Sequence, residues 1–274
     1  MKYLLTLSAI CLLLTVGCED RASTPPSQSN PADAAQSADP PAAADPTTET
    51  SGDWPIWGRT PQRNMYAPGE TDLPATFKPG EIDFDTEQVD MATTQNVKWV
   101  AKLGSQSYGN PTVADGRVFL GTNNAFPRDP KYKGDRSNVM AFDEKTGELL
   151  WQLAVPKLGA GKVSDWEYLG ICSSPAVDGQ RVFVVTNRCE VIALDVQGLK
   201  NGNDGPFQDE AKYLGAELGE TDGDILWRYD MREELGVFPH NVASNSALVV
   251  GDHVLVATSN GVDWSHTNIP NPRA

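Results

Sequence analysis

Three short segments of the sequence are rich in side chains that can bind a polar ligand. They are residues 106–110, 166–172 and 236–241, and they hold more Tyr, Asn, Cys and His than a turn requires. Phenol, amide, thiol and imidazole groups exchange hydrogen bonds, so together they can form a binding site. The alternative is that they fill a narrow rim and satisfy nearby backbone groups. The six candidate residues are Tyr108, Asn110, Tyr168, Cys172, His240 and Asn241.

Motifs for catalysis or metal binding are weak. The sequence has no nucleophile elbow, no phosphate-binding loop and no arrangement of paired carboxylates. Its three histidines, His240, His253 and His266, are not spaced four residues apart as helical zinc ligands are. Residues 201–205 (Asn-Gly-Asn-Asp-Gly) suggest calcium but lack the ligand spacing and distal Glu of an EF-hand. We therefore identify no catalytic residues and predict no metal site.

Each polar segment leads into a repeated β-hairpin. The hairpins are residues 110–123, 174–187 and 246–260. In each, a short apolar strand passes through a tight turn into a second strand rich in β-branched residues. Glycine supplies the positive φ that such turns need. The turn glycines are Gly116, Gly179 and Gly251.

A second strand–turn–strand unit follows the first hairpin and ends in a tryptophan. It runs from 139 to 151. Its second copy is split: residues 191–195 open it, residues 221–227 close it, and an insertion at 196–220 lies between, with room for a short helix at 209–218. An earlier closing strand is predicted at 96–100. The recurring tryptophans are Trp99, Trp151 and Trp227, and we expect them to pack between neighbouring sheets.

Four antiparallel strands repeated in tandem are typical of β-propeller blades. We predict an all-β chain with one closing strand, two full blades and the first two strands of a third, which makes about two and a half blades. A propeller hides its strand edges by closing its ring. The prediction is therefore a C-terminally incomplete fragment of a larger propeller.

The unit at 139–151 resembles a known repeat. The pattern Ala-x-Asp-x-x-Thr-Gly-x-x-x-Trp is similar to the pyrroloquinoline-quinone (PQQ) type of propeller repeat, found in quinoprotein alcohol dehydrogenases and in the outer-membrane assembly lipoprotein BamB. Residues 53–64 look like the start of many such proteins, and the resemblance covers residue 54 to the end. In this fold, loops that enter the first strand of each blade gather near the axis, which implies that the six candidate residues line one pore mouth. The motif residues are Ala141, Asp143, Thr146, Gly147 and Trp151.

The N-terminus predicts export and a lipid anchor. A short basic start and an apolar run are followed by residues 14–18, Leu-Thr-Val-Gly-Cys, which resemble a bacterial lipobox. Residues 1–18 are then a lipoprotein signal peptide and Cys18 carries the lipid. The alternative is an ordinary signal peptide in which Cys18 is incidental. Residues 19–52 lack aromatic and aliphatic β-branched residues, so we predict a disordered tether. The propeller domain is predicted at 53–274.

The net charge and the cysteine content restrict the possible ligands and covalent bonds of the protein. The net charge is −15 and no basic cluster stands out, which argues against nucleic-acid binding. Two cysteines remain outside the N-terminal segment, Cys172 and Cys189. In an exported domain they form either one disulfide or two buried free thiols.

Three functions are consistent with these patterns. The favoured one is a non-catalytic binding or assembly scaffold in the bacterial cell envelope, anchored to the outer membrane, facing the periplasm and binding an envelope protein without a cofactor. The alternative is a PQQ- and calcium-dependent alcohol dehydrogenase, which the resemblance alone supports. A third is an envelope protein that binds a sugar or another polymer.

Overall fold

The computed structural model describes residues 52–258. The chain divides into two compact units, Met1–Thr47 and Thr48–Ala274, and all described residues lie in the second. The predicted signal peptide, the lipid site at Cys18, almost all of the tether and residues 259–274 lie outside the described residues. None of the helices between residues 52 and 258 is long and apolar enough to cross a membrane.

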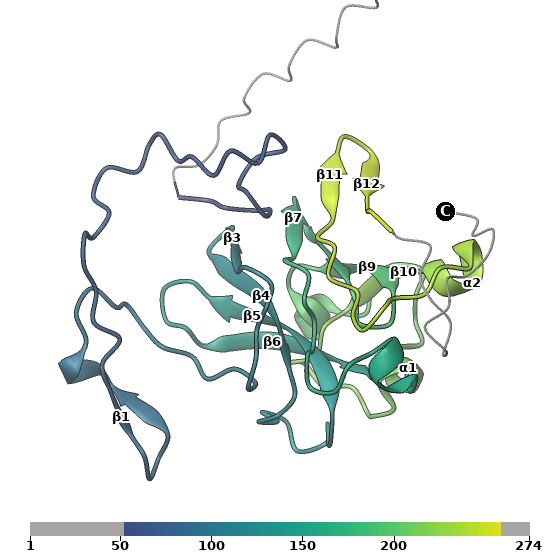
Figure 1. The fold of residues 1–274 in the computed structure, drawn as a ribbon, viewed down its shortest axis with the longest axis horizontal. Helices are drawn as coiled ribbons and strands as arrows, with labels where there is room; N and C mark the ends of the chain where they lie inside the picture. The colour runs from purple at the N-terminus through teal and green to yellow at the C-terminus, as the bar shows by residue number, and fades with distance from the viewer. Residues whose placement is uncertain (1–51, 259–274) are drawn as a thin grey trace, which may run out of the picture. The chain divides into compact units, whose positions relative to one another are not determined.

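Two four-stranded antiparallel sheets dominate the fold (Figure 1). Blade one has the strand order β3-β4-β5-β6, and blade two has β7-β8-β9-β10 in the same sequential order. This confirms the predicted all-β class and the two full blades. Their strands are β3 (Thr112–Ala114), β4 (Arg117–Asn123), β5 (Arg136–Asp143), β6 (Leu149–Pro156), β7 (Ala176–Asp178), β8 (Arg181–Val185), β9 (Glu190–Asp195) and β10 (Ile225–Asp230).

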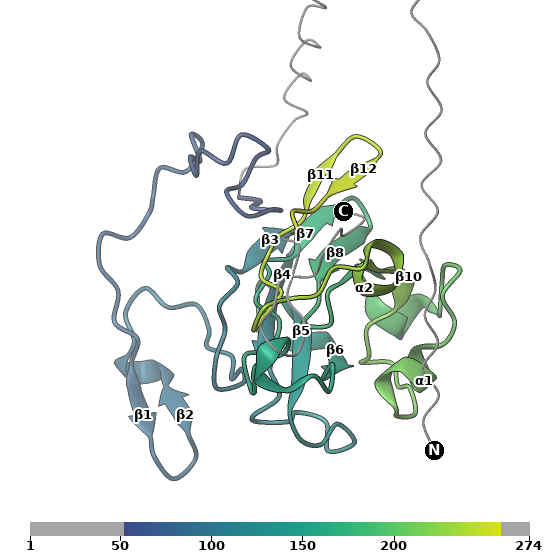
Figure 2. The same ribbon diagram turned by 45° about the vertical axis from the view of Figure 1, so that its right-hand side comes forward.

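Shorter elements surround the blades. Strands β11 and β12 pair as the antiparallel hairpin predicted to open a third blade. Strands β1 and β2 form a separate hairpin that the sequence analysis did not predict. Figure 2 shows both hairpins from a second side. The bounds are β1 (Glu81–Asp83), β2 (Gln88–Asp90), β11 (Leu248–Val250), β12 (His253–Leu255), the 3₁₀ helices η2 (Met91–Thr93), η3 (Gly161–Val163) and η4 (Gly198–Asn201), and the helices α1 (Glu210–Leu214) and α2 (Met231–Leu235).

The predicted strand at residues 96–100 is wrong, because these residues have no strand partner in the structure. A closing strand needs the third strand of its own blade beside it. The described residues that precede it form the hairpin β1–β2 instead, and the nearest pairing is a single bridge between Lys78 and Gln95. Trp99 nevertheless packs on Phe142 with ring centroids 6.3 Å apart.

The repeat motif sets the register within both blades. Phe119 pairs with Ala141 in blade one, as Phe183 pairs with Ala193 in blade two. Across the next ladder, Trp151 lies opposite Ala141. Trp227 lies opposite Ala193 in the same way. The alanine of the motif therefore sits beside the tryptophan, where its small side chain leaves space for the indole.

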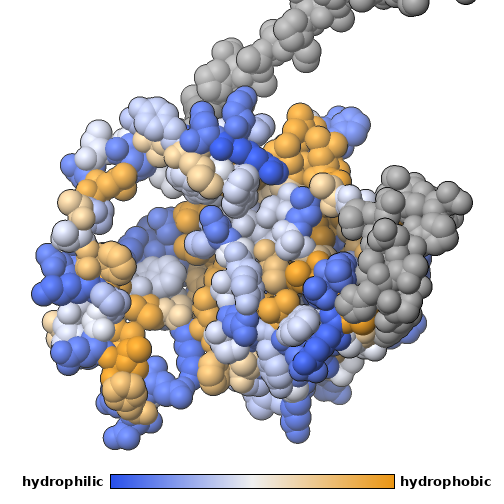
Figure 3. Space-filling model, viewed as in Figure 1, coloured by the Kyte–Doolittle hydropathy of each residue, from blue (hydrophilic) through white to orange (hydrophobic). Residues whose placement is uncertain are grey.

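The main core lies between the two blades. Phe119, Trp151 and Leu153 of blade one are fully buried together with Val184 and Ile192 of blade two. Alternate residues of a strand point to opposite faces, so each blade presents one apolar face to its neighbour. Both outlying hairpins carry exposed apolar side chains, among them Ile82, Phe84, Val250 and Leu255 (Figure 3).

The tryptophans tie one blade to the next. The indole nitrogen of Trp99 donates a hydrogen bond to the backbone oxygen of Glu144 at 2.8 Å. The indole nitrogen of Trp151 donates in the same way to Val196 at 2.9 Å. Each acceptor directly follows the aspartate of the repeat motif. A buried indole N–H needs such a partner, so each tryptophan is anchored to the aspartate turn of the unit that follows it.

Candidate functional site

A pocket of about 700 Å³ opens where the first strands of the blades begin. Asn110, Ser174 and Ser246 occupy equivalent positions of the repeat and all contribute to its lining. Because these positions precede β3, β7 and β11, the blades themselves bring them together. The pocket therefore lies where loops entering neighbouring blades meet, as the sequence analysis expects of a pore mouth.

A hydrogen-bond ladder joins these equivalent positions. The backbone N–H of Asn110 donates to the hydroxyl of Ser174 at 2.8 Å, across 64 residues of chain. The backbone N–H of Ser174 donates to the hydroxyl of Ser246 at 2.9 Å, across 72 residues. Both hydroxyls act as acceptors in the ladder. Among the described residues neither donates a hydrogen bond, so each retains an O–H for a ligand.

Three of the six predicted residues line this pocket: Tyr108, Asn110 and Cys172. Tyr108 is 59% exposed, and its hydroxyl donates to Gln106 at 2.6 Å. Cys172 is buried, and burial raises the pKa of its thiol to about 11. A thiol reacts as its thiolate. Cys172 therefore contributes a weakly polar wall rather than a nucleophile.

The other three predicted residues lie elsewhere. The backbone N–H of Tyr168 donates to Asp135 at 2.9 Å, and its carbonyl accepts from the Asn123 side chain. His240 lines a smaller, adjoining pocket of about 200 Å³ that shares Val242 and Asn245, among other residues, with the first. Asn241 exchanges backbone hydrogen bonds with Val163 at 2.6 Å and Trp166 at 2.8 Å, which ties two loops together. The structure thus divides the predicted set of six into two groups.

Sequence reasoning missed Trp57 and Arg63, which complete the pocket. The guanidinium of Arg63 lies over the indole of Trp57 at 5.1 Å from the ring centroid. Its Nε is buried and has no hydrogen-bond partner. Trp54 pairs with Val113 through backbone hydrogen bonds of 2.7 and 3.0 Å, so this N-terminal segment is held against the first strand of blade one. Residues 53–64 carried the family resemblance, but nothing in their spacing placed them at this pocket.

The lining has a distinct chemical character. Its side chains supply hydroxyls, amides and apolar surface, and Arg63 is the one charged residue among those that line it. The lining residues that the structure describes include no carboxylate or imidazole, the groups that most often move protons in general acid–base chemistry. The arrangement suits recognition of a polar or anionic group by hydrogen bonds.

Cys172 and Cys189 are not bridged, so of the two sequence-based alternatives the structure has the free thiols. Cys172 lies in the loop before β7, with its sulfur 3.9 Å from the carbonyl oxygen of Leu169. Cys189 lies between β8 and β9 and packs with Met231 and Val237. Cys172 therefore lines the pocket whereas Cys189 belongs to an apolar cluster, and the two thiols lie in different surroundings.

Comparison with family models identifies the chain. The model described as "Outer membrane protein assembly factor BamB" matches residues 89–198 and 135–263, which together make up more than half of the sequence. The chain belongs to this family. The resemblance to PQQ-type repeats is thereby confirmed, and this family member has the blades of a partial β-propeller. No curated protein matches the sequence.

Several solved structures are similar. A europium-containing methanol dehydrogenase aligns at 15% identity and a TM-score of 0.42, over 77% of this chain and 28% of its own. The quinohemoprotein alcohol dehydrogenase from Comamonas testosteroni aligns at 16% identity with a TM-score of 0.39. The alignment covers 74% of this chain and 23% of the dehydrogenase. BamB from Moraxella catarrhalis aligns at 14% identity with a TM-score of 0.20, and the alignment covers 60% of this chain and 61% of BamB. The chain therefore spans about a quarter of the length of these dehydrogenases.

The pocket does not fit the quinone after which the repeat is named. PQQ is a planar tricarboxylate, and its calcium partner needs carboxylate or carbonyl oxygens beside it. Among the described lining residues, Arg63 is the one cation for three carboxylates, and calcium would find only hydroxyls and the amides of Asn110 and Asn245, with no carboxylate beside them. No chemical step through PQQ follows from these residues.

Proposed function

We propose that this BamB-family chain is a non-catalytic scaffold of the bacterial cell envelope that binds a segment of another envelope protein. The observation that carries the proposal is the pocket lined by Tyr108, Arg63 and the serine ladder. It combines unused hydrogen-bond donors with apolar surface, and its described residues include no carboxylate or imidazole. The family match, whose description is an assembly factor, supports a role in binding proteins.

An extended peptide segment has the chemistry that this lining recognises. Its carbonyl or carboxylate oxygens would accept from the half-buried guanidinium of Arg63, with a side-chain shift where its buried Nε takes part, and from the hydroxyls of Ser174 and Ser246. A buried donor without a partner costs about 1–3 kcal/mol. A ligand that satisfies Arg63 recovers that cost. The exposed ring of Tyr108 adds apolar area of the kind that anchors protein interfaces.

Membrane attachment forms part of the proposal. Residues 14–18 resemble a lipobox, and the Ala-, Pro- and Ser-rich stretch at 19–52 has the composition of a tether. Acylation of Cys18 would place the propeller at the periplasmic face of the outer membrane. Cys18→Ser should move the protein from the membrane fraction to the soluble periplasmic fraction. If this variant stays with the membrane, the lipid anchor is excluded.

Site-specific photocrosslinking tests the binding role. A photoreactive phenylalanine analogue replaces Tyr108 in cells, and adducts are identified by mass spectrometry. The matched control places the analogue at Tyr229, which is also partly exposed, at 40%, but lies outside the pocket. We expect a discrete envelope-protein adduct at 108 that is absent at 229 and is lost when Arg63 is changed to Ala. Equal adducts at both positions, or none at 108, would contradict the proposal.

A titration separates the proposal from the enzymatic alternative. The purified chain is titrated with PQQ and calcium while the quinone spectrum and dye-linked alcohol oxidation are followed. We expect neither saturable binding of the quinone nor turnover. Saturable binding with turnover would show that the protein is a quinoprotein enzyme and would overturn the scaffold proposal.

A further inference from the structure

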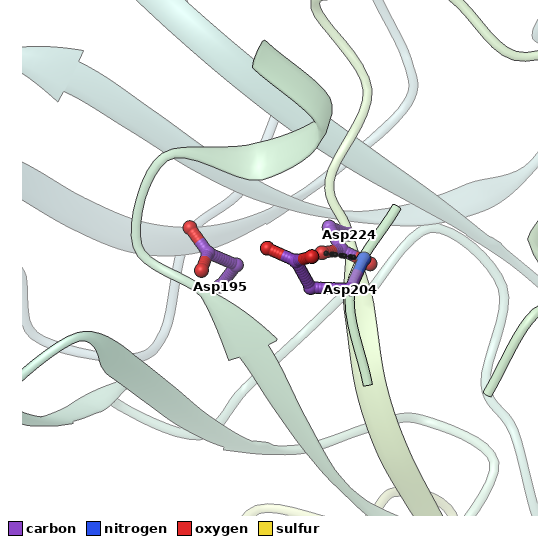
Figure 4. A group of neighbouring side chains, drawn as sticks. All are labelled: Asp195, Asp204 and Asp224. Atoms are coloured by element: carbon purple, nitrogen blue, oxygen red, sulfur yellow. Dashed lines mark hydrogen bonds between the residues drawn. The ribbon is translucent and has the colours of Figure 1, made fainter. Parts of the chain in front are cut away.

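Three aspartates meet at the end of blade two that lies opposite the pocket. Asp195 ends β9, Asp224 directly precedes β10, and Asp204 belongs to the insertion between these strands. One carboxylate oxygen from each residue lies within 4.8 Å of the others. Figure 4 shows the three side chains converging from separate parts of the chain, with a hydrogen bond between Asp204 and Asp224.

No basic side chain balances these charges. Among the ion pairs of residues 52–258, none involves any of the three aspartates. A fourth carboxylate, Glu210, is fully buried and adds to the negative potential. Like charges held this close are unfavourable unless a proton or a cation lies between them.

Asp224 provides a second, independent observation. Its side chain is fully buried, and its Oδ1 has no hydrogen-bond partner. Its other oxygen accepts from the backbone N–H of Asp204 at 3.0 Å, which holds the carboxylate beside Asp204 (Figure 4). A buried carboxylate oxygen without a partner is costly. A bound cation would satisfy it.

The equivalent turn of blade one has no insertion, and its aspartate accepts hydrogen bonds from residues of the turn. Asp143 is the counterpart of Asp195 in the repeat. Its Oδ1 accepts from the backbone of Lys145 at 2.9 Å and of Thr146 at 2.8 Å, so the turn itself satisfies it. Asp195 accepts a single hydrogen bond of this kind, from Gln197 at 2.7 Å. The insertion in blade two has replaced the compact turn and has brought two further carboxylates to the same place.

We propose that Asp195, Asp204 and Asp224 bind a divalent cation, and that Ca²⁺ is the ion they take. Calcium binds oxygen ligands at roughly 2.3–2.6 Å, so two oxygens that share it lie at most about 4.6–5.2 Å apart. The three oxygens lie within 4.8 Å of one another, so small side-chain rotations would bring all of them within reach of one ion. Calcium also tolerates irregular geometry, whereas Mg²⁺ demands a near-octahedral shell at a shorter distance. The cation would fasten the insertion at 196–224 to the ends of β9 and β10.

Calcium titration by isothermal calorimetry tests the site. The full chain is first stripped with EDTA, and CaCl₂ is then added to the wild type and to two single variants. Asp204→Asn removes one charge from the cluster at an exposed position, so it is expected to fold. The matched control is Asp209→Asn, which makes the same charge change at an exposed residue of the same insertion but outside the cluster.

We expect one saturable calcium site in the wild type, weakened at least tenfold in Asp204→Asn and changed less than twofold in Asp209→Asn. Calcium should also raise the melting temperature of the wild type and of Asp209→Asn but not that of Asp204→Asn. An absence of saturable binding to the wild type, or equal affinity in all three proteins, would overturn the proposal. Melting of the EDTA-treated variants verifies that Asp204→Asn is folded, so that lost binding is not mistaken for unfolding.

Discussion

Gly198 lies directly against the indole ring of Trp151. A Cβ atom at residue 198 would stand 2.8 Å from Cγ of Trp151 and 2.7 Å from the backbone oxygen of Asp222. Gly198 also has a φ of +63°, in the left-handed region that other residues avoid. Gly147 has the same role in blade one, where a Cβ would meet the ring of Trp99 at 2.5 Å, although the Gly-x-x-x-Trp spacing makes Gly223 its counterpart in the sequence motif. In both blades a left-handed glycine lies against the tryptophan of the preceding unit.

Gly198→Ala is expected to destabilise the protein by roughly 2–5 kcal/mol, because backbone strain and overpacking add together. Gly179→Ala is the matched control. Its φ is +55°, but a Cβ there meets nothing within 4 Å. It should cost only about 1–2 kcal/mol from the strained backbone. Urea unfolding followed by circular dichroism measures both, and an equal loss in the two variants would show that contact with Trp151 is unimportant.

Trp151 is expected to contribute heavily to stability, because its ring is fully buried between the blades. Trp151→Ala should cost about 3–5 kcal/mol. Trp151→Phe keeps an aromatic ring but loses the hydrogen bond to Val196, so it should cost less. Trp166→Ala is the control at a ring that is 41% exposed, and it should cost less than about 1 kcal/mol. Chemical denaturation gives the free energy of unfolding of the three variants. A loss in Trp166→Ala as large as that in Trp151→Ala would contradict the packing role of Trp151.

Asp222 fastens a loop of blade one to the insertion of blade two. Its fully buried carboxylate accepts hydrogen bonds from Lys131 at 2.6 Å, Tyr132 at 2.8 Å and the backbone of Gly219 at 2.7 Å. Asp222→Ala leaves these donors without their acceptor and should cost about 3–5 kcal/mol.

The exposed pair of Asp115 and Arg117, 3.0 Å apart, supplies the control for Asp222. Asp115→Ala should cost at most about 1 kcal/mol, because solvent screens an exposed ion pair. The melting temperatures of the two variants test this difference. Comparable melting temperatures would mean that the buried hydrogen bonds of Asp222 contribute no more to stability than the exposed ion pair does.

The two cysteines are expected to react slowly with thiol reagents in the native protein. Burial raises the pKa of both thiols from 9.0 to about 11. The reactive thiolate therefore accumulates only as the pH approaches 11, and at pH 8 its fraction falls about a hundredfold below that of an ordinary thiol. Alkylation rates at each cysteine, measured by peptide mass spectrometry between pH 7 and 10, should rise steadily without a plateau.

The same peptides show whether the thiols are free. After denaturation without reductant, both Cys172 and Cys189 should be alkylated, and reductant should leave the melting temperature unchanged. A linked peptide that contains both cysteines would instead establish the disulfide.

The sequence determines the hairpins and the blades of this protein. The turns at Gly116, Gly179 and Gly251 and the strands beside them depend on neighbouring residues, so their pattern is visible in one chain. The strand predicted at 96–100 failed because its pairing needs a partner strand, and residues 81–90 form a hairpin of their own. A local pattern specifies that a segment can be a strand but does not specify whether a partner is available.

Only the tertiary structure decides which polar residues meet. Tyr108, Asn110 and Cys172 share a pocket with Arg63, whereas Tyr168, His240 and Asn241 lie outside its lining. The sequence analysis also predicted no metal site, since the ligand spacing of known calcium loops is absent. The structure brings Asp195, Asp204 and Asp224 together through the insertion of blade two. Contacts between residues many positions apart depend on how blades pack and insertions fold back, and no periodicity of the chain encodes that.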